Sequence, residues 1–150
     1  MFKVVILTGI PASGKSTFYK EMFFPQYMYV SLDQVRTRSA EAELFSFCLR
    51  RKKNCVIDNT NVNAAERSRY IGKAKASGAR VCCYYFEPDI DASDARNANR
   101  SGRANVPAGA IRARAAAYGQ PRFDEGFDEI SRVSITQDGK FKVEVCDAEE

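Results

Sequence analysis

The chain has 150 residues, which suits one compact domain with a buried core, and we expect a single domain over residues 1–150. Its lack of histidine and of any CxxC pair argues against zinc sites, histidine triads and imidazole acid/base catalysis, which leaves a carboxylate as the expected catalytic base. The net charge of +4 excludes nothing, whereas the absence of any run near the roughly 18 apolar residues of a membrane span argues against membrane insertion. Five scattered cysteines favour a reducing interior, so we expect an intracellular, cytoplasmic protein.

Apolar runs alternate with helical patterns along the chain. The segment FKVVILT, residues 2–8, predicts a buried strand of a parallel sheet, and a glycine-rich turn then leads into a helix that ends before Pro25. Further strands are predicted at residues 27–33, 54–61 and 79–88, and further helices at residues 35–53, 63–78, 91–101 and 108–119. Residues 131–145 alternate apolar and polar positions about an Asp-Gly turn and predict a C-terminal β-hairpin. The alternation favours an α/β fold with a parallel sheet flanked by helices and a binding site at the carboxyl ends of the strands.

A phosphate-binding loop follows the first strand. The segment GIPASGKST, residues 9–17, matches G-x-x-x-x-G-K-[ST] between a predicted strand and a predicted helix, which is the context that such a loop requires. Its glycines let backbone N–H groups surround a phosphate, Lys15 can bridge the β- and γ-phosphates, and the Ser16 hydroxyl can ligate Mg²⁺. These features predict binding of a nucleoside triphosphate, ATP, with magnesium, through Gly9, Ala12, Ser13, Gly14, Lys15, Ser16 and Thr17.

Polar residues follow the second and third predicted strands. Asp33 ends the second strand and can accept a proton from an attacking hydroxyl, while Arg36, one helical turn further on, can clamp an anionic group. Asp58 can lie near the metal or orient the acceptor, and Thr60 offers a neutral hydrogen-bonding group. Each has a plainer interpretation, because Asp33 is also a good helix cap and DNTN is a good turn sequence.

The ordered set GIPASGKST, SLDQVR, IDNTNVNAAERSRYIGKAKASGARV, ARNANRSG and FDEGFDEI resembles the kinase domain of 5'-hydroxyl polynucleotide kinases over roughly residues 3 to 135. The resemblance implies a P-loop kinase fold with a small arginine-bearing lid. It also implies that Asp33 is the general base, that Arg36 contacts the phosphate beside the acceptor hydroxyl, and that Arg100 is the lid arginine over the donor phosphates, flanked by Arg96 and Arg103.

The sequence departs from this family in two places. Ser31-Leu32 stands where many members have Asn-Arg before the aspartate, so one basic contact to the acceptor is missing. There is also no D-x-D-G-T phosphatase motif, so we expect no fused 3'-phosphatase.

Six arginines and no acid lie between Arg96 and Arg122. Arg96, Arg100 and Arg103 fall on one face of a predicted helix and would surround an anion such as the ATP phosphates. The other three, Arg112, Arg114 and Arg122, either follow a nucleic-acid backbone or form a solvated face. Tyr118 and Phe123 can stack on bases, although core packing is favoured for both.

The sequence thus predicts ATP-dependent phosphoryl transfer to the 5'-hydroxyl end of DNA or RNA. One alternative is a related small P-loop kinase that phosphorylates a nucleoside or a hydroxymethylated base in DNA. Another is a nucleotide-binding module or a toxin-like kinase that acts in a complex. The arginine run favours a polyanionic acceptor, and Asp33 argues against a pure binding module.

Overall fold

A six-stranded sheet forms the centre of the fold. The structure is a computed structural model that describes residues 1–148, and for Arg103 and Ala108 it describes the backbone alone. The strand order is β2-β3-β1-β4-β5-β6. The strands are β1 (Lys3–Thr8), β2 (Met28–Val30), β3 (Cys55–Asp58), β4 (Arg80–Tyr85), β5 (Glu129–Ile135) and β6 (Phe141–Val145). The helices are α1 (Lys15–Met22), α2 (Leu32–Val35), α3 (Arg38–Arg50), α4 (Ala64–Ala76), α5 (Ile90–Ala98) and α6 (Ala108–Ala116), with 3₁₀ turns η1 (Gly102–Ala104) and η2 (Phe123–Glu125).

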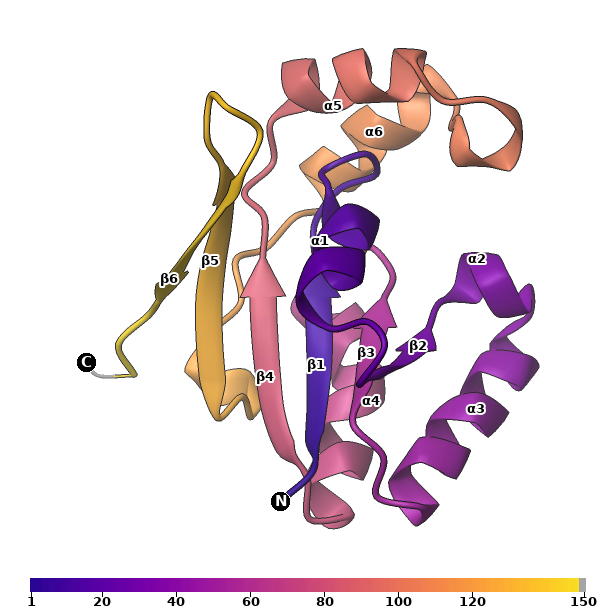
Figure 1. The fold of residues 1–150 in the computed structure, drawn as a ribbon, viewed down its shortest axis with the longest axis vertical. Coiled ribbons are helices and arrows are strands. Elements are labelled where there is room, and N and C mark those ends of the chain that lie inside the picture. The colour runs from indigo at the N-terminus through magenta and orange to yellow at the C-terminus, as the bar shows by residue number, and fades with distance from the viewer. Residues whose placement is uncertain (149–150) are drawn as a thin grey trace.

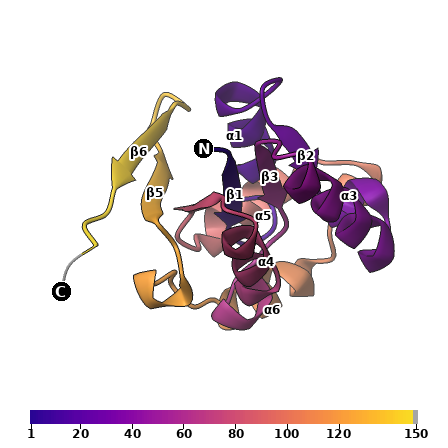
Figure 2. The same cartoon turned by 90° about the horizontal axis from the view of Figure 1, so that it is seen from below.

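The central strand β1 is buried on both faces, which explains its continuous apolar sequence. Val4 and Ile6 pack with α3 and α4 on one face, whereas Val5 and Leu7 pack on the other face, where Phe18 of α1 lies. Figures 1 and 2 show α1 and α4 on opposite sides of the sheet. The carboxyl ends of β1 and β3 therefore meet at one edge, beside the amino end of α1 (Figure 1).

Most predicted elements are present, and the predicted α/β architecture is confirmed. Strands β2, β3, β1, β4 and β5 pair in parallel, and β5 and β6 form the predicted antiparallel hairpin, with Gly139 at positive φ in its turn. Gly78 adopts φ 86° just after α4, as expected of a helix terminator.

The segment around Asp33 differs from its prediction. The strand predicted at residues 27–33 ends at Val30, and Asp33 lies in the short helix α2 instead of at a strand end. The helix predicted at residues 35–53 is interrupted, because Arg36 adopts the left-handed conformation with φ 81°. Thr37 then caps a new helix, α3, by accepting a hydrogen bond from the Ala40 N–H at 3.0 Å.

The motifs FDEGFDEI and R-x-R-Y hold distant parts of the fold together. Arg67 of α4 is 1% exposed and donates from Nε and Nη2 to the Glu125 carboxylate at 2.8 and 2.9 Å. Gly126 has φ 115°, and a Cβ there would come within 2.8 Å of Ile71. Asp128 accepts from the Val81 N–H and from Lys75. These residues fasten the segment before β5 to α4 and β4.

The lid region contains α5, η1 and α6, which lie beyond the carboxyl edge of the sheet (Figure 1). The helix predicted at residues 91–101 ends at Ala98, so Arg96 and Arg100 do not share one helical face as predicted. Asn97 holds the following loop by hydrogen bonds to both the N–H and the carbonyl of Val106, each at 2.9 Å. Over the described part of the chain, no helix is long and apolar enough to span a membrane.

Candidate active site

The phosphate loop has the tight backbone that its sequence predicts. Ala12 and Gly14 adopt positive φ angles of 62° and 103°. Gly9 is closely packed, since a Cβ there would lie 2.7 Å from the Ser13 hydroxyl and 3.2 Å from the Cβ of Phe86. A Cβ on Gly14 would lie 3.1 Å from Ile135 of the β5–β6 hairpin. The loop is therefore enclosed by the hairpin as well as by β1 and α1.

Lys15 is buried at the amino end of α1, with its side chain extended across the loop. Its Nζ donates to the carbonyl of Ile10 at 3.0 Å. Burial lowers the pKa of the Lys15 amine. The negative charge of Asp58 raises that pKa in part, the positive charge of Arg100 lowers it further, and the negative charge of Asp33 raises it. Ser13 has a buried hydroxyl without a hydrogen-bond partner among the residues that the structure describes. An unpartnered buried hydroxyl and a buried amine fit an anion within the loop.

Ser16, Asp58 and Tyr29 meet beside the loop. The Ser16 hydroxyl donates to Asp58 Oδ2 at 2.8 Å, and the Tyr29 hydroxyl donates to the same oxygen at 2.5 Å. Burial raises the pKa of Tyr29, and the Asp58 carboxylate raises it further. Tyr29 was not predicted as a site residue from the sequence. Its one signal there is its position near the end of a predicted strand, which in the fold lies beside the strand that ends at Asp58.

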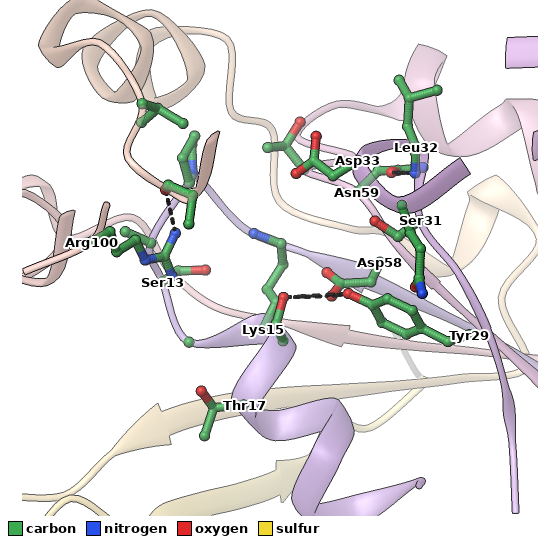
Figure 3. Close-up of a pocket in the computed structure, with 18 of the residues that line it drawn as sticks. Ser13, Lys15, Thr17, Tyr29, Ser31, Leu32, Asp33, Asp58, Asn59 and Arg100 are labelled. Atoms are coloured by element: carbon green, nitrogen blue, oxygen red, sulfur yellow. Dashed lines mark hydrogen bonds between the residues drawn. The ribbon is translucent and has the colours of Figure 1, made fainter. Parts of the chain in front are cut away.

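These groups line a pocket of about 650 Å³ (Figure 3). Loop residues from Pro11 to Thr17 form one side, and α2 with the ends of β2 and β3 forms the other. In Figure 3, Lys15 lies between Arg100 on one side and Asp58 and Asp33 on the other. Residues outside the loop that line the pocket include Asp33, Arg38, Asp58, Asn59, Thr60 and Arg100.

A hydrogen-bond network fixes α2 against α3 and α4. Asn59 accepts from the Leu32 N–H at 2.9 Å and donates to Glu41 and to the Tyr70 hydroxyl at 2.5 and 3.0 Å. Glu41 is 2% exposed and also accepts from Tyr70 and Arg38, at 2.9 and 3.0 Å. Sequence reasoning missed Glu41, Tyr70 and Arg38. The i,i+3 spacing of Arg38 and Glu41 indicates that these two can pair, but nothing along the chain indicates that Tyr70 joins them.

The predicted site residues differ in how near they lie to the pocket. Thr60 lines it and accepts a hydrogen bond from Arg114 at 3.2 Å. Arg96 is absent from the lining but donates to the carbonyl of Ala12 at 3.0 Å. Arg36 is exposed and does not line the pocket, whereas Arg38 does. The side chain of Arg103 lies outside what the structure describes.

The three later arginines are paired with acids of this chain. Arg114 contacts Glu66 at 2.7 Å, Arg122 contacts Asp124 at 2.7 Å, and Arg112 lies 3.8 Å from Asp94. These pairs favour a solvated face over a nucleic-acid track, the two alternatives that the sequence left open. Tyr118 and Phe123 pack against apolar clusters, as favoured.

The residues present fit a magnesium ion held jointly with a nucleotide. Within residues 1–148 no group of three or more His, Cys, Asp or Glu side chains is arranged to hold a metal by itself. Mg²⁺ commonly takes one or two protein oxygens and completes its shell with phosphate and water. The Ser16 hydroxyl and the Asp58 carboxylate, 2.8 Å apart beside the loop, are such oxygens.

The fold and the loop define the class of protein as a P-loop nucleotide-binding α/β protein. The chain belongs to the AAA domain family, whose sequence profile matches residues 36–121, more than half of its length.

Two curated relatives are named as polynucleotide enzymes. The chain is 27% identical over 135 residues to the bifunctional polynucleotide phosphatase/kinase of Schizosaccharomyces pombe, covering 87% of this chain and 33% of that protein. It is 32% identical over 74 residues to the putative bifunctional polynucleotide phosphatase/kinase of Acanthamoeba polyphaga mimivirus, covering 49% of this chain and 18% of that protein. The chain thus spans a third or less of the length of these relatives.

Solved structures share the fold at low sequence identity. A sugar kinase from Janibacter sp. matches with a TM-score of 0.65 and 14% identity, covering 88% of this chain and 86% of that one. Chaetomium thermophilum Kti12 in complex with ADP-AlF3 matches with a TM-score of 0.64 and 17% identity, covering 86% of this chain and 87% of that one. These matches support the P-loop fold.

Proposed function

We propose that the chain transfers the γ-phosphoryl group of ATP to the 5'-hydroxyl end of DNA or RNA. The observation that carries this proposal is the pocket of about 650 Å³ in which the phosphate loop faces Asp33, Asp58 and Thr60 across a common space. A donor phosphate and a hydroxyl acceptor both have room in a pocket of this size. The name and the 27% identity of the Schizosaccharomyces pombe relative support a polynucleotide acceptor.

In the proposed mechanism the loop and its lysine hold the donor. Lys15 places its charge on the β- and γ-phosphates by leaving the Ile10 carbonyl, which it contacts at 3.0 Å. Arg100 approaches the transferring group from the lid side and stabilises its charge. Ser16 and Asp58 would hold Mg²⁺, which supplies further neutralisation of the phosphate oxygens when bound.

Asp33 acts on the acceptor in this proposal. Its carboxylate takes the proton of the 5'-hydroxyl while that oxygen attacks the γ-phosphorus, and the bond to the ADP leaving group breaks. Thr60 lines the acceptor side of the pocket and can hydrogen-bond the acceptor. No histidine is needed for either proton transfer or charge stabilisation, consistent with a chain that has none.

A different hydroxyl acceptor is the second candidate, because the pocket lining does not itself require a polynucleotide end. The acceptor would be a nucleoside or a hydroxymethylated base in DNA. The pairing of Arg112, Arg114 and Arg122 with acids weakens one argument for a polyanionic acceptor and so keeps the nucleoside open.

The test offers γ-labelled ATP with a 5'-hydroxyl oligonucleotide, a free nucleoside and hydroxymethylated DNA whose ends are blocked. The proposal predicts label on the oligonucleotide in its DNA form, its RNA form or both. Label confined to the nucleoside or to the blocked DNA would replace the proposal by the second candidate. A Lys15→Ala variant is the control, since it should abolish labelling of every acceptor.

A further inference from the structure

We infer that the outer edge of strand β6 pairs antiparallel with β6 of a second copy of this chain, which gives a symmetric dimer with one continuous sheet. This inference goes beyond the proposed function and does not depend on the acceptor. The observation that carries it is the sequence of β6, FKVEV, which is complementary to itself when two copies run antiparallel about Val143.

Strand β6 ends the sheet, and none of the elements within residues 1–148 pairs with its outer side. Figures 1 and 2 show it as the outermost strand. Two of its apolar side chains are accessible, with Val143 38% and Val145 67% exposed. Edge strands are commonly protected from pairing by a proline, a bulge or charged side chains. The sequence of β6 contains no proline, its register with β5 is unbroken, and its two charged residues have opposite signs.

The open edge of β6 carries the backbone groups of alternate residues. The Lys140 carbonyl accepts a hydrogen bond from the chain of β5 at 2.8 Å, and the Cys146 N–H donates one to it at 2.8 Å. Residues with even numbers therefore turn their backbone groups toward β5. The N–H and carbonyl groups of the odd-numbered residues point to the open edge, where a second strand can bond to Phe141, Val143 and Val145.

One symmetric register brings opposite charges together. With Val143 opposite its own copy, Phe141 pairs with Val145 of the second copy, so the backbone groups of the three odd-numbered residues are all bonded. Lys142 then lies directly opposite Glu144 of the second copy. A register centred one residue earlier or later would set Lys142 against Lys142 or Glu144 against Glu144, which is destabilising.

The two faces of this contact match in chemistry. The odd-numbered side chains share the sheet face on which the rings of Phe141 and Phe18 lie 5.1 Å apart, so pairing extends an apolar face. Lys142 and Glu144 share the other face. Arg132 contacts only Oε1 of Glu144, which leaves Oε2 for the second copy, and Lys142 has no ion pair within residues 1–148. The dimer would give this lysine a carboxylate.

The contact adjoins the proposed donor site without including its residues. A Cβ on Gly14 would lie 3.1 Å from Ile135 and 3.6 Å from Phe141, so the β5–β6 hairpin packs against the phosphate loop on the α1 face. Lys142 and Glu144 lie on the opposite face of β6. Substitutions at these two positions therefore change the edge and leave the loop intact.

The test places the exchanged charges in two separate chains. In sedimentation velocity, wild type should behave as a dimer of the 16.8 kDa chain. Lys142→Glu and Glu144→Lys each set like charges opposite one another in their homodimers, so each should raise the dissociation constant about 10-fold or more. An equimolar mixture restores both opposite-charge pairs and should form a heterodimer about as tightly as wild type dimerises.

Lys53→Glu is the matched control, because it makes the same change of charge at an exposed position before β3 and should leave the dissociation constant unaltered. Wild type that stays monomeric up to about 1 mM would overturn the inference. So would a mixture that associates no more tightly than its two components. Assemblies larger than a dimer would also contradict it, because pairing about a two-fold axis closes with two copies.

Val143→Pro is a second test that involves no charge. It removes the N–H that points to the second copy and no hydrogen bond to β5, as an edge strand tolerates, so it should raise the dissociation constant at least about 10-fold. Val143→Thr keeps the N–H and the branched shape and should still dimerise. A folded proline variant, checked by circular dichroism, that dimerises like wild type would refute the pairing. These readouts use neither ATP nor an acceptor, so they are independent of the proposed function.

Discussion

Lys15 carries a buried amine whose pKa lies below its ordinary value of 10.5 because burial disfavours the charged form. The charged form is present below that lowered pKa and is lost as pH rises through it. Affinity of the free protein for ATP should therefore fall in alkaline solution before pH 10.5 is reached. Titrating the binding of a non-hydrolysable ATP analogue against pH measures this, and an affinity that stays constant up to pH 10.5 would contradict it.

In the proposed function, the acceptor chemistry depends on Asp33. Asp33→Asn keeps the size of the side chain but cannot take a proton, so kcat should fall about 100- to 10,000-fold. The affinity for ATP should change little, because the phosphate loop is untouched. Single-turnover rates together with nucleotide binding check this, and a variant with wild-type turnover would remove Asp33 as the base.

The donor half of the proposed site was readable in the sequence because its residues are contiguous. Gly9, Gly14, Lys15 and Ser16 lie within one loop, and their spacing alone indicates the fold of that loop. Tyr29 and Glu41 were missed because their contacts come from β3 and α4, far along the chain. Such contacts depend on the packing of elements, which no local pattern records.

At the scale of elements, a buried ion pair is one of the contacts that hold the segment between α6 and β5. Glu125→Ala would leave Arg67 buried without its carboxylate and should lower the free energy of unfolding by about 3 kcal/mol. Asp124→Ala, one residue away on the surface, should change stability little and is the matched control. Urea unfolding of both variants provides the measurement, and equal stability of the two would contradict the role of the pair.

Most elements were predicted, and the errors have a common cause. A strand buried on both faces shows a short continuous apolar run, as β1 does, and a helix that buries one face shows apolar residues at helical spacing, as α4 does. The break at Arg36 was missed because a left-handed arginine has no sequence signal comparable to glycine. The break makes α2 a separate short helix, and Asn59 accepts a hydrogen bond from the Leu32 N–H at its start.

At the scale of the whole molecule, the parallel sheet assembles the pocket from four parts of the chain. The loop after β1, the ends of β2 and β3, and the lid all meet at one edge of the sheet (Figure 1). The alternation of strands and helices predicted that edge. The distribution of charge was not predictable in the same way, because Arg112 and Arg114 pair with acids that only the tertiary fold brings near.

The most direct test of the central claim uses two oligonucleotides of identical sequence, one with a 5'-hydroxyl and one with a 5'-phosphate. With γ-labelled ATP and Mg²⁺, the protein should label only the 5'-hydroxyl strand, and a phosphatase should then remove the label. Equal labelling of both strands, or labelling of neither, would contradict transfer to a 5'-hydroxyl end.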